Sequence, residues 1–198
     1  MATITSEAVK ELRDKTNAGM MDCKKALTET NGDMEKAVDL LRQKGLAVAQ
    51  KRSGRATSEG VVECYIHAGS KLGVMVEVAC ETDFVAKTDG FRAFARDVAM
   101  HVAASNPAAI SREDVQADLL ERERAIYTAQ ALDSGKPEKI VGKIVDGKME
   151  KFLSEVCLLE QKFVKNPDLT IQDLLNELIA KMGENISIKR FARYQIGA

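Results

Sequence analysis

The chain has 198 residues, of which 45% are hydrophobic, 30% charged and 5% aromatic. This length suits one ordinary domain with a small companion, and the net charge of −1 creates no field that would attract nucleic acid or an anionic membrane. No apolar run approaches the roughly 18 residues that span a bilayer, and residues 1–10 lack the pattern of a secretory signal. We therefore expect a soluble cytoplasmic protein without direct nucleic-acid or membrane binding.

The first 46 residues predict three short helices. Val9 and Leu12 mark the apolar face of the first helix, Asp33 is a suitable N-cap for the third, and Gly45 stands where that helix should end. Such a small bundle buries little area and is more typical of a recognition module than of an active site. Residues 1–46 are therefore predicted to form a separate partner-docking domain.

Residues 44–59 are polar, basic and prone to turns, with Lys51, Arg52 and Arg55 among them. We predict a linker over residues 47–59. An RNA-binding patch is the alternative interpretation, but a few basic residues without aromatic side chains to stack on bases are a weak signal.

Residues 60–198 predict an α+β core in which a three-stranded antiparallel sheet packs with helices. The run over 72–80 alternates cleanly between two faces, with Val74 and Val76 on the apolar one. Strands are expected at 61–66, 72–80 and 186–196, helices at about 84–104, 111–132, 140–156 and 171–179, and a loop at 163–168. The helix at 84–104 has an apolar stripe formed by Phe91, Ala95, Val98 and Val102.

The segment Thr82-Asp83-Phe84-Val85 joins the second strand to the following helix. Phe84 lies seven residues before Phe91, which places both on one face of a continuous helix and favours a core position for Phe84, with Thr82 or Asp83 as the helix cap. The alternative interpretation puts Asp83 and Phe84 at the surface as an acid beside an aromatic wedge. Spacing alone favours the core position.

The sequence contains few residue patterns that would support covalent catalysis. The four cysteines form no C-x-x-C pair, no Cys and His stand at the tight spacing of a zinc site, and no phosphate-loop motif occurs. Reduced, buried thiols are expected, with no metal and no cofactor. A cysteine hydrolase based on Cys80 and His101 remains an alternative that nothing local supports, and we expect a protein that is not an enzyme.

Several segments closely resemble the translation elongation factor Ts family. They are VKELR (9–13), TNAGMMDCKKAL (16–27), TDFVAK (82–87), AMHVAA (99–104), GENI (183–186) and RF (190–191). Because these motifs occur in order over nearly the whole chain, the resemblance is highly specific.

The resemblance implies an N-terminal ubiquitin-associated-like (UBA-like) domain, a linker and an α+β core. It also implies a guanine-nucleotide exchange factor, which binds elongation factor Tu·GDP and promotes GDP release during translation elongation. In that family Asp83 and Phe84, framed by Thr82 and Val85, would press between two helices of the partner's G domain and disturb its Mg²⁺ and phosphate site.

Further partner contacts are implied for His101 in the core and for Arg13, Met20 and Met21 in the N-terminal module. Longer members of the family carry two core halves and an inserted antiparallel helical hairpin, whereas this chain runs from one strand pair through helices to a single closing strand. One half-core leaves a sheet edge to cover, so we predict a homodimer.

Overall fold

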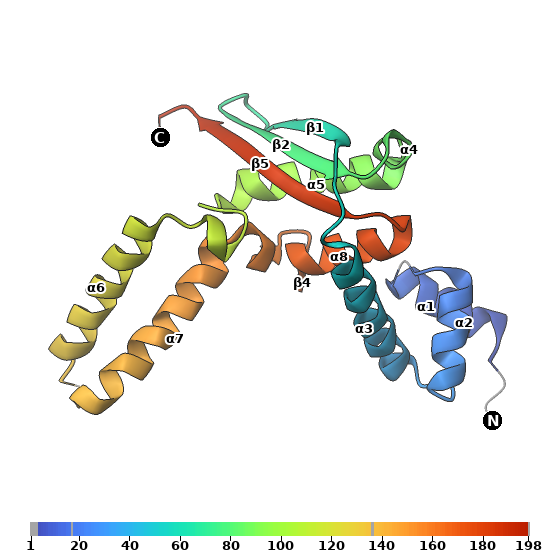
Figure 1. Cartoon of the computed structure of the whole chain (residues 1–198), viewed down its shortest axis with the longest axis horizontal. Coiled ribbons are helices and arrows are strands. Elements are labelled where there is room, and N and C mark those ends of the chain that lie inside the picture. The colour runs from blue at the N-terminus through green and yellow to red at the C-terminus, as the bar shows by residue number, and fades with distance from the viewer. Residues whose placement is uncertain (1–3, 17, 136, 198) are drawn as a thin grey trace. The chain divides into compact units, whose positions relative to one another are not determined.

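The computed structural model of the protein describes residues 4–16, 18–135 and 137–197 (Figure 1). The helices are α1 (Ser6–Thr16), α2 (Met20–Glu29), α3 (Met34–Arg52), α4 (Asp83–Ala86), α5 (Asp89–Ser105), α6 (Ala117–Asp133), α7 (Glu138–Val156) and α8 (Ile171–Met182), with the short 3-10 turns η1 (Arg112–Asp114) and η2 (Leu158–Glu160). The strands are β1 (Glu59–Ile66), β2 (Leu72–Cys80), β3 (Lys162–Phe163), β4 (Asn166–Thr170) and β5 (Ile186–Gln195). The predicted α+β class is confirmed.

The chain groups into two compact units, each built from three segments. Unit 1 comprises Met1–Glu63, Glu77–Arg96 and Asp173–Lys189, and unit 2 comprises Cys64–Val76, Asp97–Gln172 and Arg190–Ala198. Within the described residues, no helix has the length and apolar character needed to cross a membrane.

In unit 1, α1, α2 and the first part of α3 form the predicted three-helix bundle (Figure 1). Its buried residues are Val9, Leu12, Cys23, Ala26, Leu27 and Ala37. The Asp33 side chain caps α3 by accepting the N–H of Lys36 at 3.1 Å. The predicted helix end at Gly45 is wrong, because α3 continues to Arg52 and takes in the first part of the predicted linker. The following residues, 46–52, are mostly good helix formers, and they outweigh the modest cost of one interior glycine.

The main sheet has the strand order β1-β2-β5. The N–H of His67 donates to the carbonyl of Leu72 at 2.9 Å and closes the β1–β2 hairpin, while the N–H of Ile196 donates to the carbonyl of Lys71 at 2.9 Å. The end of β5 therefore lies beside the start of β2, and both strand pairs are antiparallel. The predicted apolar face of β2 is confirmed, since Val74, Val76, Val78 and Cys80 are all buried, and Ala79 on the opposite face is buried as well.

In unit 2, α6 and α7 pack against each other as an antiparallel two-helix hairpin (Figure 1). Its buried residues are Ala131, Val141, Val145 and Met149. The hairpin corrects the expectation that only longer family members carry such an element. Gly142 and Gly147 do not interrupt α7, and an added Cβ at either position would meet nothing within 4 Å.

Three smaller expectations are also corrected. The helix expected from residue 111 begins with the 3-10 turn η1, and α6 starts only at Ala117. The loop predicted at 163–168 lies within the antiparallel β3–β4 pair, whose two-residue first strand is too short to show a periodicity. Among the four thiols, Cys64 is exposed on β1, whereas the other three are buried.

Candidate partner-binding site

The four residues predicted to bind a partner lie together on the single turn that leads into and forms α4. Phe84 is 78% exposed, whereas Val85 is 8% and Ala86 6% exposed beneath it. Phe91, the residue with which Phe84 was expected to share a core face, is fully buried. The core interpretation of Phe84 is therefore wrong, and the surface alternative describes its position.

The turn separates from the next helix because Thr88 ends one helix and begins another. Its hydroxyl donates to the carbonyl of Val85 at 2.8 Å and accepts the N–H of Phe91 at 3.3 Å. This second contact is an N-cap for α5, with Asp89 in the first turn. The pair Thr88-Asp89 is a start signal visible in the sequence, and it removes the continuous helix on which the seven-residue spacing relied.

Glu184 holds the beginning of the turn. The backbone N–H of Thr82 donates to Oε2 of Glu184 at 3.0 Å, and the hydroxyl of Thr82 donates to Oε1 at 2.6 Å. The Cys80 thiol donates to the carbonyl of Thr82 at 3.1 Å. The N–H and hydroxyl of Thr82 are thus bonded from outside α4, and its carbonyl accepts both the Cys80 thiol and, at 3.3 Å, the N–H of Ala86 in α4.

Asn185 holds the residue before the turn. Its N–H donates to Oε1 of Glu81 at 2.6 Å, and its side-chain amide donates to the carbonyl of Arg55 at 2.7 Å. The Asn185 N–H lowers the pKa of Glu81, with a smaller contribution from Arg55. Gly183 makes this arrangement possible, because its φ of +76° ends α8 in a conformation that favours glycine.

The far side of the turn lies against the end of α8. The Thr88 hydroxyl approaches the sulfur of Met182 at 3.9 Å. A Cβ atom at Gly90 would lie 2.8 Å from the terminal methyl of Met182, so the two segments are closely packed. The exposed ring of Phe84 therefore stands on a turn supported from both ends.

Asp83 lies beside Phe84 and is paired with a cation. Nζ of Lys87 lies 2.5 Å from Oδ2 of Asp83, and the Asp83 side chain is 47% exposed. The bond from Lys87 lowers the pKa of Asp83, so this carboxylate is charged at neutral pH. The turn presents a charged acid next to an apolar ring.

The predicted contacts in the N-terminal bundle are accessible. Met20 is 50% and Met21 63% exposed at the start of α2, and Arg13 is exposed on α1. These side chains can meet a partner without any change in the bundle.

His101, by contrast, is completely buried in unit 2. The N–H of Val164 approaches Nδ1 at 3.4 Å, and Nε2 lies 2.9 Å from Oε1 of Gln161. A donor at Nδ1 leaves Nε2 to carry the proton, which fits a neutral ring, and burial lowers the pKa of His101. A contact between His101 and a partner stays a prediction, and it requires this buried ring to become accessible.

The hydrolase alternative gains no support from these thiol and imidazole environments. Burial raises the pKa of the Cys80 thiol, which is the opposite of what a nucleophilic cysteine needs. In the described part of the chain, no group of three or more His, Cys, Asp or Glu side chains could hold a metal ion.

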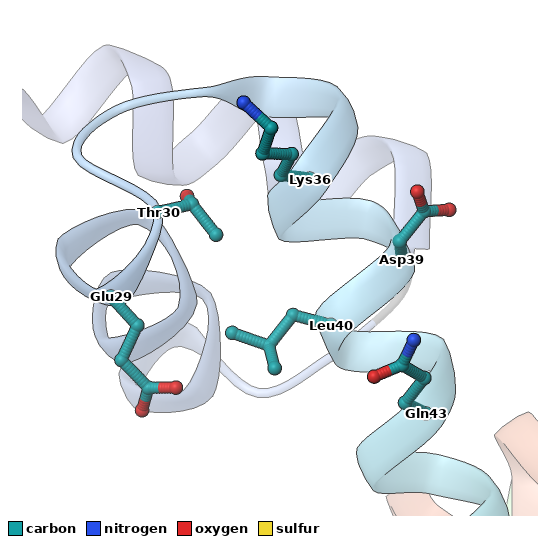
Figure 2. Close-up of a pocket in the computed structure, with 6 residues that line it drawn as sticks. All are labelled: Glu29, Thr30, Lys36, Asp39, Leu40 and Gln43. Carbon is teal, nitrogen blue, oxygen red and sulfur yellow. The ribbon is translucent and has the colours of Figure 1, made fainter.

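A shallow depression of about 370 Å³ lies between the end of α2 and α3. It is lined by Glu29, Thr30, Lys36, Asp39, Leu40 and Gln43, and Figure 2 shows Leu40 pointing from α3 toward the end of α2. Nζ of Lys36 is already paired with Asp33 at 2.7 Å, and the other charged lining residues are acids. This lining is a poor fit for a phosphate group.

Comparison with known proteins places the chain in a family. The profile of the family described as Elongation factor TS matches residues 2–198. An Elongation factor Ts from Desulfotalea psychrophila is 75% identical over 195 residues, covering 98% of this chain and 99% of the relative. One from Desulfosudis oleivorans is 68% identical over 197 residues and covers 100% of both chains. One from Geobacter sulfurreducens is 60% identical over 195 residues, covering 98% of this chain and 90% of the relative. The chain therefore belongs to the elongation factor Ts family.

Proposed function

We propose that the protein is a cytoplasmic guanine-nucleotide exchange factor that binds elongation factor Tu·GDP and promotes GDP release. Family membership supports the partner, and the observation that carries the mechanism is the exposed Phe84 on a turn anchored at both ends. No covalent step is involved, so the protein catalyses a conformational change without being an enzyme in the chemical sense.

The exchange step follows from differential binding. GDP is held by charge-assisted bonds to a phosphate loop and by Mg²⁺. A factor that binds the nucleotide-free partner more tightly than the GDP-bound partner weakens GDP binding by the same factor. Phe84 and Asp83 would enter between two helices of the G domain, and that insertion would disturb the Mg²⁺ and phosphate site.

The wedge alone is a modest driving force. Burying one phenylalanine contributes about 1.5–3 kcal/mol, or roughly tenfold to a hundredfold in an equilibrium. The rest of the coupling must come from a wider interface, to which Arg13, Met20 and Met21 are suited because they are exposed. We propose residues 1–46 as the docking domain, 47–59 as its connection and 60–198 as the core that carries the wedge.

The test is a GDP-release assay with elongation factor Tu loaded with fluorescent GDP. The wild-type protein should accelerate release, and Phe84→Ala should reduce this acceleration at least tenfold if the ring supplies the burial energy given above. Leu132→Ala, which truncates a 51% exposed apolar side chain on α6, is the matched control and should behave as wild type. Unchanged release with the wild-type protein would refute the proposal.

We also propose a homodimer that covers the main sheet. Apolar side chains are exposed on all three strands or their ends: Ile66 is 62%, Met75 44%, Tyr194 69% and Ile196 74% exposed. The outer strands β1 and β5 leave edges that a second copy could cover. Analytical ultracentrifugation at micromolar concentration should show a dimer for the wild-type protein and a monomer for Ile66→Glu. A wild-type protein that is only monomeric would refute the proposed dimer.

A further inference from the structure

We propose that Glu184 is a positioning residue for nucleotide exchange, which acts through Thr82 to keep Phe84 presented to the partner. This inference rests on the proposed function. Glu184 and Thr82 are 102 residues apart in the chain, and each carboxylate oxygen of Glu184 accepts a different hydrogen from Thr82. One acid therefore binds both the backbone and the side chain of Thr82, which starts the turn over residues 82–86 that carries Phe84, called the wedge turn below.

Ordinary helix capping does not account for this arrangement. Threonine is a common N-cap because its own hydroxyl can accept a backbone N–H of the first turn. Thr82 occupies the N-cap position of α4, yet its side chain makes no cap bond, and its hydroxyl donates to Glu184. Glu184 accepts the backbone N–H of the N-cap residue, which in a capping box is accepted by a Glu or Gln of the helix itself.

The support that Glu184 gives to Thr82 matters because α4 has only four residues. A helix of that length has no stability of its own and persists only through outside contacts. Val85 and Ala86 anchor its apolar side in the core, and Glu184 anchors its polar start. Loss of the Glu184 contact should let the start of the turn fray, which would cost entropy each time Phe84 had to be ordered against a partner.

The carboxylate is itself well placed. Gly183 reverses the chain at the end of α8, and Asn185, which is 6% exposed, is bonded to Glu81 and to the carbonyl of Arg55. Glu184 thus sits between two fixed neighbours. The GENI segment, which the resemblance singled out without assigning it a role, acquires one as the support of the wedge.

The first test needs no partner. In Glu184→Gln the charge of the carboxylate is lost, so the two charge-assisted bonds from Thr82 become weaker neutral ones even if both contacts persist. Hydrogen exchange followed by NMR should show the Thr82 amide exchanging about tenfold faster, the scale of one hydrogen bond to a charged group. Glu121→Gln, an exposed acid on α6, is the matched control and should leave that amide unchanged. An unaltered Thr82 amide in Glu184→Gln would overturn the inference.

The second test separates positioning from docking. Release of fluorescent GDP from elongation factor Tu is measured over a range of concentrations of this protein. Glu184→Gln should lower the maximum release rate about tenfold, again the scale of one charged hydrogen bond, while the half-saturating concentration stays within about twofold of wild type because the N-terminal bundle is untouched. A purely structural defect would instead lower the thermal midpoint and the active fraction without this split.

Variants at Thr82 test whether Glu184 acts through its contact with Thr82. Thr82→Ser keeps the hydroxyl and should retain the wild-type maximum rate, whereas Thr82→Val should reproduce the Glu184→Gln loss. The two losses should not add in the double variant, because both act on the same contact. Additive losses, or an unchanged maximum rate in Glu184→Gln with active wild-type protein, would overturn the positioning role alone. Inactive wild-type protein would overturn the proposed function as well.

Discussion

Phe84 and Phe91 stand seven residues apart, and their environments are opposite. Phe91 is fully buried in the stripe of α5, and Phe84 is 78% exposed on the wedge turn. A continuous helix would place them on one face, but Thr88 divides the segment into two helices. The comparison teaches that one capping residue can convert a core position into a surface position without any change in apolar spacing.

The two residues are also held in place by different forces. Phe91 belongs to a periodic apolar face with Ala95 and Val98, so its position follows from burial. The wedge turn is held by the buried Val85 and Ala86 and, in addition, by the polar contacts that Thr82 donates to Glu184. Stability should therefore depend on Phe91 and partner binding on Phe84, and the two properties should be separable by mutation.

The largest expected effect comes from truncating the buried ring. Phe91→Ala should lower the free energy of unfolding by about 3–5 kcal/mol, because it leaves a cavity in a packed core. Phe84→Ala should change it by no more than about 0.5 kcal/mol, as for an exposed site. Urea denaturation followed by circular dichroism measures both. Equal losses in the two variants would mean that Phe84 packs inward in solution.

A second effect concerns His101, which is buried like Phe91 although it was expected to contact a partner like Phe84. His101→Leu should cost about 1–3 kcal/mol, because Gln161 and the N–H of Val164 lose their partner. Burial lowers the pKa of His101 in the folded state, so the unfolded chain binds more protons as the pH falls. The stability due to the neutral ring is present above about pH 6.5 and is lost as the pH falls through the lowered pKa.

Denaturation midpoints between about pH 7.5 and 5.5, a window that spans the ordinary histidine pKa, measure this loss. The wild-type midpoint should fall toward the acid end, and His101→Leu should remove that part of the slope. His67→Leu, at an exposed histidine, is the control and should keep the wild-type slope. The same slope in wild type and His101→Leu would show that His101 is not held neutral by burial.

Glu177 on α8 and Phe84 are opposite cases. Phe84 is an apolar ring exposed to water, whereas Glu177 is a charged group that is partly buried. Burial raises its pKa, with a contribution from Asp173, and Arg42 opposes the shift. The folded state therefore binds more protons than the unfolded chain, and stability falls as the pH rises from about 4.5 through the raised pKa.

Glu177→Gln should remove this penalty. We expect a gain of about 0.5 kcal/mol at pH 7, on the scale of substitutions outside the core, and no gain below pH 4. Thermal unfolding at both pH values measures it. A loss of stability at pH 7 would show that the ionised carboxylate makes favourable contacts that outweigh its burial.

The smallest effect is expected at the surface pair beside the wedge. Lys87→Met should let the pKa of Asp83 rise toward its ordinary value of 3.8, because the bond from Lys87 is the main cause of its lowering. The unfolding midpoint should not change measurably, since both side chains are largely exposed. An NMR titration of the Asp83 carboxylate follows the pKa, and an unchanged value would remove Lys87 as its cause.

Much of the regular structure was predictable because burial imposes a local period. The apolar face of β2, the stripe of α5 and the Asp33 cap are each visible within a few residues, and the structure confirms them. The start of α5 was also readable from Thr88-Asp89, although the apolar spacing across it suggested a longer helix. Local signals fail where two of them compete, as periodicity and capping do here.

The remaining features depend on contacts between distant segments. The α6–α7 hairpin and the burial of His101 beside β3 are decided by packing that no short window contains.

For the wedge, the sequence by itself determined the residues Thr82-Asp83-Phe84-Val85, their place after a buried strand and their family resemblance. Only the tertiary structure decided that Phe84 faces outward, because Glu184 reaches Thr82 from 102 residues further along the chain and Met182 closes the other end of the turn. Short-range spacing records which side chains are apolar, whereas exposure depends on what the rest of the chain brings to cover them.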